Sequence, residues 1–202
     1  MRTHGWGGAQ PSSDEEAITR ILDAADDAIE ARGADMRIAD VARALGVSRQ
    51  TVYNYFPGAG ALLEAAATRS GLQFLDILAD HLTGITDPIE ALVESLAYTL
   101  EWLPEDRAIQ VMLVHDFTKA STGITSDACV QFGHAILAGL DVDWSDLGLD
   151  DAALDDLVEY MLRILQSFTI DPGRPPRSGE RLRDYLRRWV APVVFTEIAA
   201  HR

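Results

Sequence analysis

The sequence predicts an all-α protein of about nine helices, and three observations support this fold class. Apolar residues recur every three or four positions along most of the 202-residue chain. No segment shows the strict alternation or the Asn-Gly turn typical of a β-hairpin. Residues that favour helix starts and ends, such as Ser13, Gly46 and Asp87, border the apolar stripes. We therefore expect packed helices and no sheet.

The first expected helix begins after Ser13, which precedes Glu16 in the spacing of a capping box. The helix should end near Gly33, and its apolar stripe comprises Ile18, Ile21, Leu22, Ala25 and Ile29. Residues 1–13 are rich in glycine and polar residues and lack the apolar stretch of a secretory signal. We expect them to form a flexible tail.

Two short helices should follow, separated by a tight turn. Residues 38–45 repeat the apolar stripe, Gly46 can adopt the left-handed conformation that ends a helix, and Ser48 can cap the next one. This pattern is that of a helix-turn-helix. In the second short helix Val52 and Phe56 lie four residues apart and can anchor it to a core.

The remaining helices are expected over residues 60–82, 88–102, 105–119, 126–140, 150–170 and 179–200. Asp87, Pro88 and Glu90 supply the cap, first-turn proline and third-position acid of one of them. Pro192 should kink the last helix or reset its register. We predict a small domain over residues 14–67 and a larger helical body over 68–202.

Composition excludes several classes of protein. With 17 Lys and Arg against 32 Asp and Glu, the net charge is −15, which excludes a generally basic nucleic-acid coat or a polybasic membrane tether. The single cysteine, Cys129, can form neither an intramolecular disulfide nor a cysteine-based zinc site. No apolar stretch is long enough to span a membrane, so we expect a cytoplasmic protein.

The outer face of the second short helix carries side chains that can form hydrogen bonds. Arg49, Gln50, Tyr53 and Asn54 fall together opposite Val52 and Phe56. Arginine can pair with guanine, glutamine or asparagine with adenine, and tyrosine can donate to phosphate. Residues 36–56 also carry a local charge of +2 in an acidic chain. The alternative is an ordinary helical hairpin.

The segment resembles the DNA-binding domain of the TetR (tetracycline-repressor-like) family of bacterial regulators. The likeness covers about residues 14–67 and is carried by Ile38-Ala39, Ala42, Leu45-Gly46-Val47-Ser48, Thr51-Val52-Tyr53, Tyr55-Phe56-Pro57 and Leu62-Leu63. One departure is Ala59, which stands where the family usually has a lysine that contacts phosphate. The resemblance implies a homodimeric regulator, in which a small apolar or amphipathic effector releases a repressor from a palindromic operator.

The expected sites follow from this resemblance and from the helical stripes. Residues expected to contact double-stranded DNA are Arg37, Ser48, Arg49, Gln50, Thr51, Tyr53, Asn54 and Tyr55. Those expected at a dimer interface are Leu154, Leu157, Val158, Met161, Leu162 and Leu165 with Leu182, Tyr185, Leu186, Trp189 and Val193. An effector pocket is expected near Phe74, Trp102, Met112, His115, Phe117, Phe132 and Phe168.

The sequence does not support a metal site or a catalytic site. Asp141, Asp143 and Ser145 begin like a calcium loop, but the required glycine and final glutamate are missing. The histidines lack metal-ligand spacing, and no catalytic motif or cofactor-binding loop is present, so we predict neither a cofactor nor an enzyme. The competing hypotheses are a helical interaction module that has lost DNA reading and an all-α enzyme.

Overall fold

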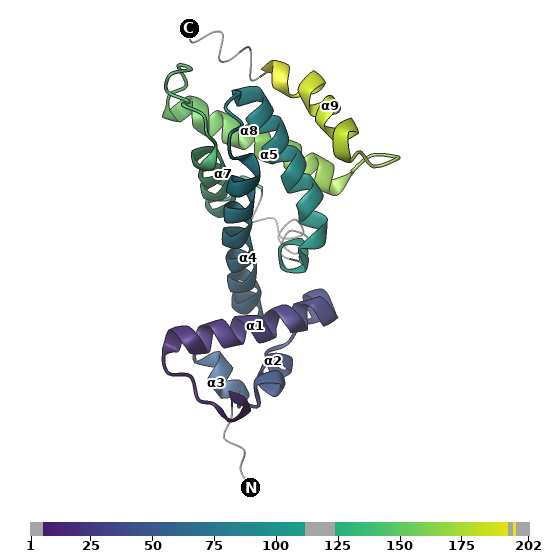
Figure 1. Ribbon diagram of the computed structural model, residues 1–202. Coiled ribbons are helices and arrows are strands. Elements are labelled where there is room, and N and C mark those ends of the chain that lie inside the picture. The colour runs from purple at the N-terminus through teal and green to yellow at the C-terminus, as the bar shows by residue number, and fades with distance from the viewer. Residues whose placement is uncertain (1–5, 112–123, 194–195, 197–202) are drawn as a thin grey trace. The chain divides into compact units, whose positions relative to one another are not determined.

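The computed structural model describes residues 6–111, 124–193 and 196. In these ranges the chain forms eight complete α-helices and three 3-10 turns, with no strand, and the predicted all-α fold is confirmed (Figure 1). The helices are α1 (Asp14–Arg32), α2 (Ile38–Leu45), α3 (Arg49–Tyr53), α4 (Ala59–Leu82), α5 (Pro88–Trp102), α7 (Asp127–Gly139), α8 (Asp151–Ile170) and α9 (Gly179–Trp189). Residues 107–111, in the predicted 105–119 helix, are also helical.

The chain divides into two compact units. The first contains residues 1–72 and 106–118, and the second contains 73–105 and 119–202. The boundary falls inside α4, between Leu72 and Gln73, a few residues beyond the expected division at 67. The segment starting at Asp106 also packs with the first unit, which the sequence pattern did not predict.

In the first unit, α1 lies across α2 and α3 (Figure 1). The side chains of Ile21 and Ile29 from α1, Val41 from α2 and Leu62 from α4 are almost fully buried and form the core. Ser13 caps α1 as predicted, with its hydroxyl accepting from the Glu16 N–H at 3.1 Å. These contacts fix the two short helices against the long first one.

Only one half of the predicted capping box forms at the start of α1. Glu16 Oε2 accepts from the backbone N–H and the hydroxyl of Ser12, at 2.7 and 2.6 Å, instead of reaching Ser13. Arg20 donates to the carbonyl of Ala9 at 2.7 Å. Residues 9–13, expected to belong to a flexible tail, are therefore tied to α1 at two points.

Ion pairs join α4 to α1 within the first unit. Arg69 reaches Asp23 at 2.7 Å and Asp26 at 2.5 Å, two acids one turn apart on α1. The neighbouring Ser70 hydroxyl donates to the carboxylate of Asp106. The other oxygen of Asp106 caps the following helical residues by accepting from the Ile109 N–H. The middle of α4 is thus tied both to α1 and to the segment that starts at Asp106.

The core of the second unit lies between α5, α8 and α9. Its fully or nearly fully buried members include Ala97 from α5 and Leu182 and Leu186 from α9, and partly buried side chains of α8 pack against them. Phe74 stacks on Trp102 with ring centroids 4.1 Å apart. In the connection after α7, Trp144 is buried and its indole N–H donates to the Leu137 carbonyl at 3.2 Å.

The last described residues fit the predicted effect of Pro192. Helix α9 ends at Trp189, and residues 191–193 are helical again after a break at Val190. The remainder of the predicted 179–200 helix lies largely outside the described residues.

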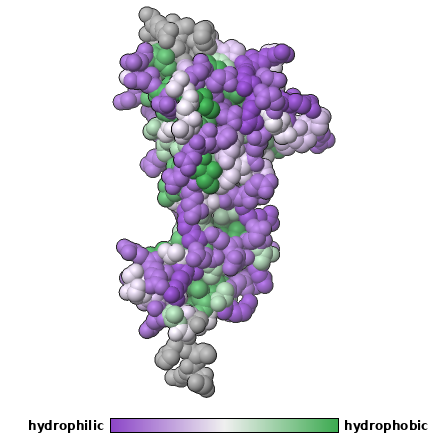
Figure 2. Space-filling model, viewed as in Figure 1, coloured by the Kyte–Doolittle hydropathy of each residue, from purple (hydrophilic) through white to green (hydrophobic). Residues whose placement is uncertain are grey.

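Hydrophilic residues dominate the face shown in Figure 2. Among the described helices, none has the length and apolar character needed to cross a membrane.

A row of acids on α5 binds two arginines on α9. Arg183 donates to both oxygens of Glu94 at 2.6 and 2.7 Å and also reaches Glu101, while Arg187 pairs with Glu90 at 3.0 Å. His81 lies 2.8 Å from Glu94. The hydrogen bonds from Arg183 lower the pKa of Glu94 from about 4.5 to about 2. This carboxylate therefore stays ionised far into the acid range.

Replacing Glu94 with Gln should lower the free energy of unfolding at neutral pH by about 1 kcal/mol, since a partly buried charge pair loses one member. A carboxylate with a depressed pKa stabilises the fold above its unfolded value. The difference between the two proteins should therefore be complete above about pH 4.5 and vanish as the pH approaches 2. Urea denaturation over this range measures it. The control is Glu159→Gln, which breaks an exposed pair with Arg163 on α8. Equal losses in both variants would contradict the assignment.

Candidate nucleic-acid interface

The turn between α2 and α3 has the geometry that the sequence predicts. Gly46 adopts φ 65° and ψ 27°, a left-handed conformation that glycine accepts without strain. Its N–H faces the carbonyls of Ala42 and Arg43, and the Val47 N–H donates to Ala42 at 2.9 Å. The chain then reverses and begins α3 directly after Ser48. The helix-turn-helix is thereby closed by main-chain hydrogen bonds.

Ser48 caps α3. Its hydroxyl oxygen accepts from the Thr51 N–H at 3.1 Å, and the hydroxyls of Ser48 and Thr51 lie 2.9 Å apart. Ser48 is exposed and Thr51 is half-buried. These two predicted DNA contacts thus form one small hydroxyl pair at the start of α3.

Helix α3 has a buried and an exposed side. Val52 is fully buried and Phe56, just beyond the helix, is 9% exposed. Arg49, Gln50 and Asn54 are exposed on the other side, and Tyr53 is 46% exposed. The structure therefore brings these four predicted contacts to one accessible surface, the α3 outer face.

Two members of the α3 outer face are already paired. The Gln50 side-chain amide donates to the Asn54 carbonyl oxygen at 3.1 Å, one helical turn away. This bond leaves one Gln50 N–H, the Gln50 carbonyl oxygen and the Asn54 NH₂ group for other partners. The pair thus offers both donors and acceptors, as the edge of an adenine requires.

Tyr55 differs from the other predicted contacts. Its side chain is half-buried, and its hydroxyl donates to the Asp14 carboxylate at the start of α1, at 3.0 Å. This hydrogen bond raises the pKa of Tyr55. To contact a phosphate, the hydroxyl would have to leave Asp14. An acidic group therefore lies beside one predicted DNA contact, a feature that periodicity along the helix did not reveal.

The cations near the turn divide into free and paired groups. Arg37, the residue before α2, and Arg49 are exposed and make no ion pair within the described part of the chain. Arg43 pairs with Asp40 at 3.2 Å, and Arg32 lies 3.6 Å from the other oxygen of Asp40. Arg37 and Arg49 are thus the cations that remain available to an anion.

Ala59 is the first residue of α4 and is half-buried. It has no polar atom beyond its main chain, so the phosphate contact that a lysine would supply is missing from this helix start. Among the described residues, no group of three or more His, Cys, Asp or Glu side chains could hold a metal ion.

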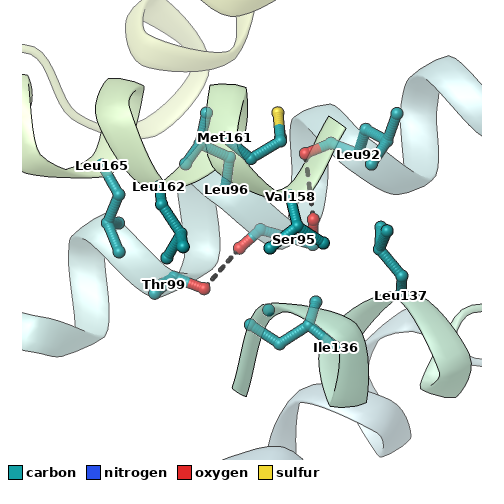
Figure 3. A pocket seen from close by; sticks show the side chains of 11 residues that line it. Leu92, Ser95, Leu96, Thr99, Ile136, Leu137, Val158, Met161, Leu162 and Leu165 are labelled. Atoms are coloured by element: carbon teal, nitrogen blue, oxygen red, sulfur yellow. Dashed lines mark hydrogen bonds between the residues drawn. The ribbon is translucent and has the colours of Figure 1, made fainter. Parts of the chain in front are cut away.

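The four predicted effector residues that the structure describes fall into two separate aromatic groups. Phe74, Trp102 and Phe132 belong to an aromatic cluster, while Phe168 packs edge-on against Tyr185 with ring centroids 5.7 Å apart. Met112, His115 and Phe117 lie outside the described residues. The small cavity in the second unit is lined by other side chains from α5, α7 and α8 (Figure 3).

Most of the predicted dimer residues lie inside a single chain. Leu157, Val158, Leu162, Leu182 and Leu186 are at most 8% exposed, and Met161, Leu165 and Tyr185 pack on the same core. Leu154 is half-buried. Trp189 and Val193 are 64% and 48% exposed. Periodicity identified apolar stripes but not which molecule covers them.

The chain is similar in sequence to known bacterial transcriptional regulators. Residues 21–66 match the family model of the bacterial regulatory proteins of the tetR family. An HTH-type transcriptional regulator found in two strains of Mycobacterium tuberculosis is 27% identical over 191 residues, covering 93% of this chain and 90% of the relative.

Two solved structures share the fold. The TetR family repressor AlkX of a Dietzia strain, implicated in biodegradation of n-alkanes, superimposes with a TM-score of 0.63 at 24% identity, covering 89% of this chain and 96% of that one. A Clostridium perfringens putative fatty acid metabolism regulator gives a TM-score of 0.52 at 17% identity, covering 83% and 94%. Both likenesses extend over the two units.

Replacing Gly46 with Ala should lower the free energy of unfolding by about 1–2 kcal/mol, the cost of the left-handed conformation for a residue with a Cβ. An added Cβ at this position meets no atom within 4 Å, so the effect isolates backbone strain. The control is Gly60→Ala in the first turns of α4, which is equally uncrowded and should raise stability by about 0.5 kcal/mol. Chemical denaturation measures both, and an unchanged Gly46→Ala protein would refute the turn assignment.

Proposed function

Because the chain belongs to the tetR family of bacterial regulatory proteins, DNA-binding regulators of transcription, we propose that it acts as a homodimeric repressor of a palindromic operator. A small apolar or amphipathic effector releases it from the operator. We place this activity in the cytoplasm, where the operator is accessible.

The observation that carries the proposal is the two-sided character of α3. Burial of Val52 and Phe56 orients the helix, and the α3 outer face presents Arg49, Gln50, Tyr53 and Asn54 to solvent. Such a short helix with exposed base-reading groups suits the major groove of DNA.

Each exposed residue receives a role from its chemistry. Arg49 pairs with guanine, and the Gln50–Asn54 pair reads adenine. Arg37, Ser48, Thr51 and Tyr53 bind phosphates, and Tyr55 joins them when its hydroxyl leaves Asp14. The phosphate contacts set the position of α3, and the base contacts give it specificity.

Two-fold pairing of the chain supplies the second reading helix. A single helix-turn-helix makes few contacts, and dimers remedy this by binding two half-sites one helical turn apart. The exposed apolar side chains Ile170, Trp189 and Val193 belong to α8 and the region of α9. We assign the dimer surface to these residues and to Leu154, since the other predicted interface residues are covered within one chain.

Effector action follows from differential binding. A ligand shifts a two-state equilibrium only by the difference between its affinities for the two states. We propose that the effector binds the second unit most tightly in a state whose two reading helices no longer match successive major grooves.

The experiment that tests the proposal is selection of bound fragments from genomic DNA at a fixed salt concentration by the full-length protein. A two-fold symmetric consensus would support the regulator. Absence of any selected sequence would favour the interaction module, for which Ala59 and the net charge of −15 argue. Turnover of a substrate would instead favour an enzyme.

Arg49→Ala should weaken binding to the selected operator by about 1–3 kcal/mol and relax preference at one base position, because a bidentate contact to guanine is lost. Tyr53→Phe provides the contrast, since loss of a phosphate contact should weaken binding to all sequences alike. Fluorescence anisotropy with single-position operator variants measures both. An Arg49→Ala protein with unchanged base preference would refute its role.

Ala59→Lys should tighten binding to the operator and to unrelated duplexes alike, because it adds one phosphate contact at the start of α4. The logarithm of the association constant should then fall more steeply with the logarithm of salt concentration, by about 0.9. Gln73→Lys adds the same charge on an exposed position of the same helix and is the control. Equal salt slopes in the two variants would exclude Ala59 from the interface.

A further inference from the structure

The start of α1 lies beside the end of α3 within the first unit (Figure 1). Asp14 is the first residue of α1, and Tyr55 follows Asn54, the C-cap residue of α3. The Tyr55 hydroxyl donates to Asp14 Oδ1 at 3.0 Å and so joins two residues that are 41 positions apart in the chain. One hydrogen bond therefore connects the acidic end of α1 with a residue that is proposed to bind DNA.

The main chain holds both partners of this bond in place. Ser13 caps α1 by accepting from the Glu16 N–H at 3.1 Å. The Tyr55 N–H donates to the Val52 carbonyl, also at 3.1 Å. The Tyr55 side chain is half-buried, whereas Asp14 is exposed. The hydroxyl thus reaches the surface at a fixed point, where either Asp14 or a group from outside can accept its hydrogen.

The two acceptors exclude each other. A tyrosine hydroxyl has one hydrogen to donate, so Tyr55 cannot bind a DNA phosphate while it is bonded to Asp14. A carboxylate and a phosphate are both charged acceptors and form hydrogen bonds of similar strength. Exchanging one acceptor for the other therefore gains little free energy.

The first turn of α1 adds repulsion at the same place. A helix N-terminus ordinarily attracts an anion through its free N–H groups and its dipole. Here the first turn carries its own carboxylates, on Asp14, Glu15 and Glu16. Glu16 is compensated by an ion pair with Arg20 at 2.6 Å, whereas the other two acids make no ion pair among the residues that the structure describes. A phosphate that approaches Tyr55 therefore meets an uncompensated negative charge.

We propose that Asp14 competes with the DNA phosphate for the hydroxyl of Tyr55 and thereby lowers the affinity of the protein for every duplex. The inference rests on the proposed function, because it assigns a further role at the same DNA-binding surface. Tyr55 contributes a phosphate contact only where Asp14 releases it. A bracing role, in which Asp14 merely steadies the end of α3, predicts the opposite change in DNA binding when Asp14 is removed.

The first test is a double-mutant cycle of Asp14→Ala and Tyr55→Phe, measured by fluorescence anisotropy on the full-length protein at one salt concentration. In the wild-type background, Tyr55→Phe should change the affinity for the selected operator by less than about twofold, because one hydrogen bond replaces another. In the Asp14→Ala background the same change should weaken binding by about fivefold, which corresponds to one hydrogen bond of about 1 kcal/mol. Additive effects of the two changes would overturn the competition.

Glu15→Ala is the matched control. It removes an equal charge from the neighbouring exposed residue of α1, whereas the Tyr55 hydroxyl donates to Asp14. The control therefore reports the gain in affinity from the lower charge alone, and Asp14→Ala should tighten binding by about fivefold more. An Asp14→Ala protein that binds the operator more weakly than wild type would support the bracing role and overturn the proposal.

A random-sequence duplex of equal length identifies the competing acceptor. Since a phosphate contact carries no sequence information, this duplex should respond to each substitution by the same factor as the operator. An effect of Asp14→Ala that is confined to the operator would overturn the phosphate as the competing group.

A second test needs no DNA. The hydrogen bond to Asp14 raises the pKa of Tyr55, because it favours the protonated phenol and places a negative charge beside the phenolate. Asp14→Ala should therefore lower the pKa of Tyr55 towards its ordinary value of about 10, while Glu15→Ala should change it little. NMR titration of ¹³C-labelled tyrosine measures this pKa, and Tyr55→Phe identifies the signal. An unaltered pKa in Asp14→Ala would overturn the hydrogen bond on which the competition depends.

The two proposals fail differently. Operator binding with additive effects in the cycle would refute the competition and leave the regulator standing. Absence of binding to any duplex by every protein of the cycle would refute the DNA-binding function and this inference with it.

Discussion

A helix of five residues does not hold its shape in water, because its few main-chain hydrogen bonds cannot offset the cost of ordering the first turn. Helix α3 therefore depends on the burial of Val52 and Phe56. The cap from Ser48 and the left-handed turn at Gly46 fix where the helix begins. Everything assigned to the α3 outer face follows from this anchoring, since a loosely held helix could not present its side chains in one orientation.

The second unit combines a row of charge pairs with an apolar layer. Charge pairs between α5 and α9 hold these helices together, with Glu94 bridging His81 and Arg183. The apolar layer beneath contains two small voids, and Leu92, Leu96 and Met161 line both of them. The charge pairs hold α5 and α9 together beside this less tightly packed layer.

Local signals in the sequence predicted the fold well. Ser13, Ser48 and Asp87 accept hydrogen bonds at helix starts, and Gly46 adopts a positive φ, because caps and turns depend on residues close in the chain. The exposed side of α3 was predictable for the same reason. The hydroxyl partner of Tyr55 was not, since Asp14 is far from it in sequence. The lining of the cavity was also missed, because an apolar stripe shows which face is buried but not what packs against it.

The carboxylate of Asp14 beside Tyr55 affects how such a regulator finds its target. Lysine and arginine contacts to the phosphate backbone let proteins slide along arbitrary duplex, and this chain offers few free cations near α3 while carrying an acid at its margin. We therefore expect residence on random sequence to be brief. The search for a cognate site would then rely mainly on repeated collisions from solution, and weak binding to random sites would sharpen discrimination.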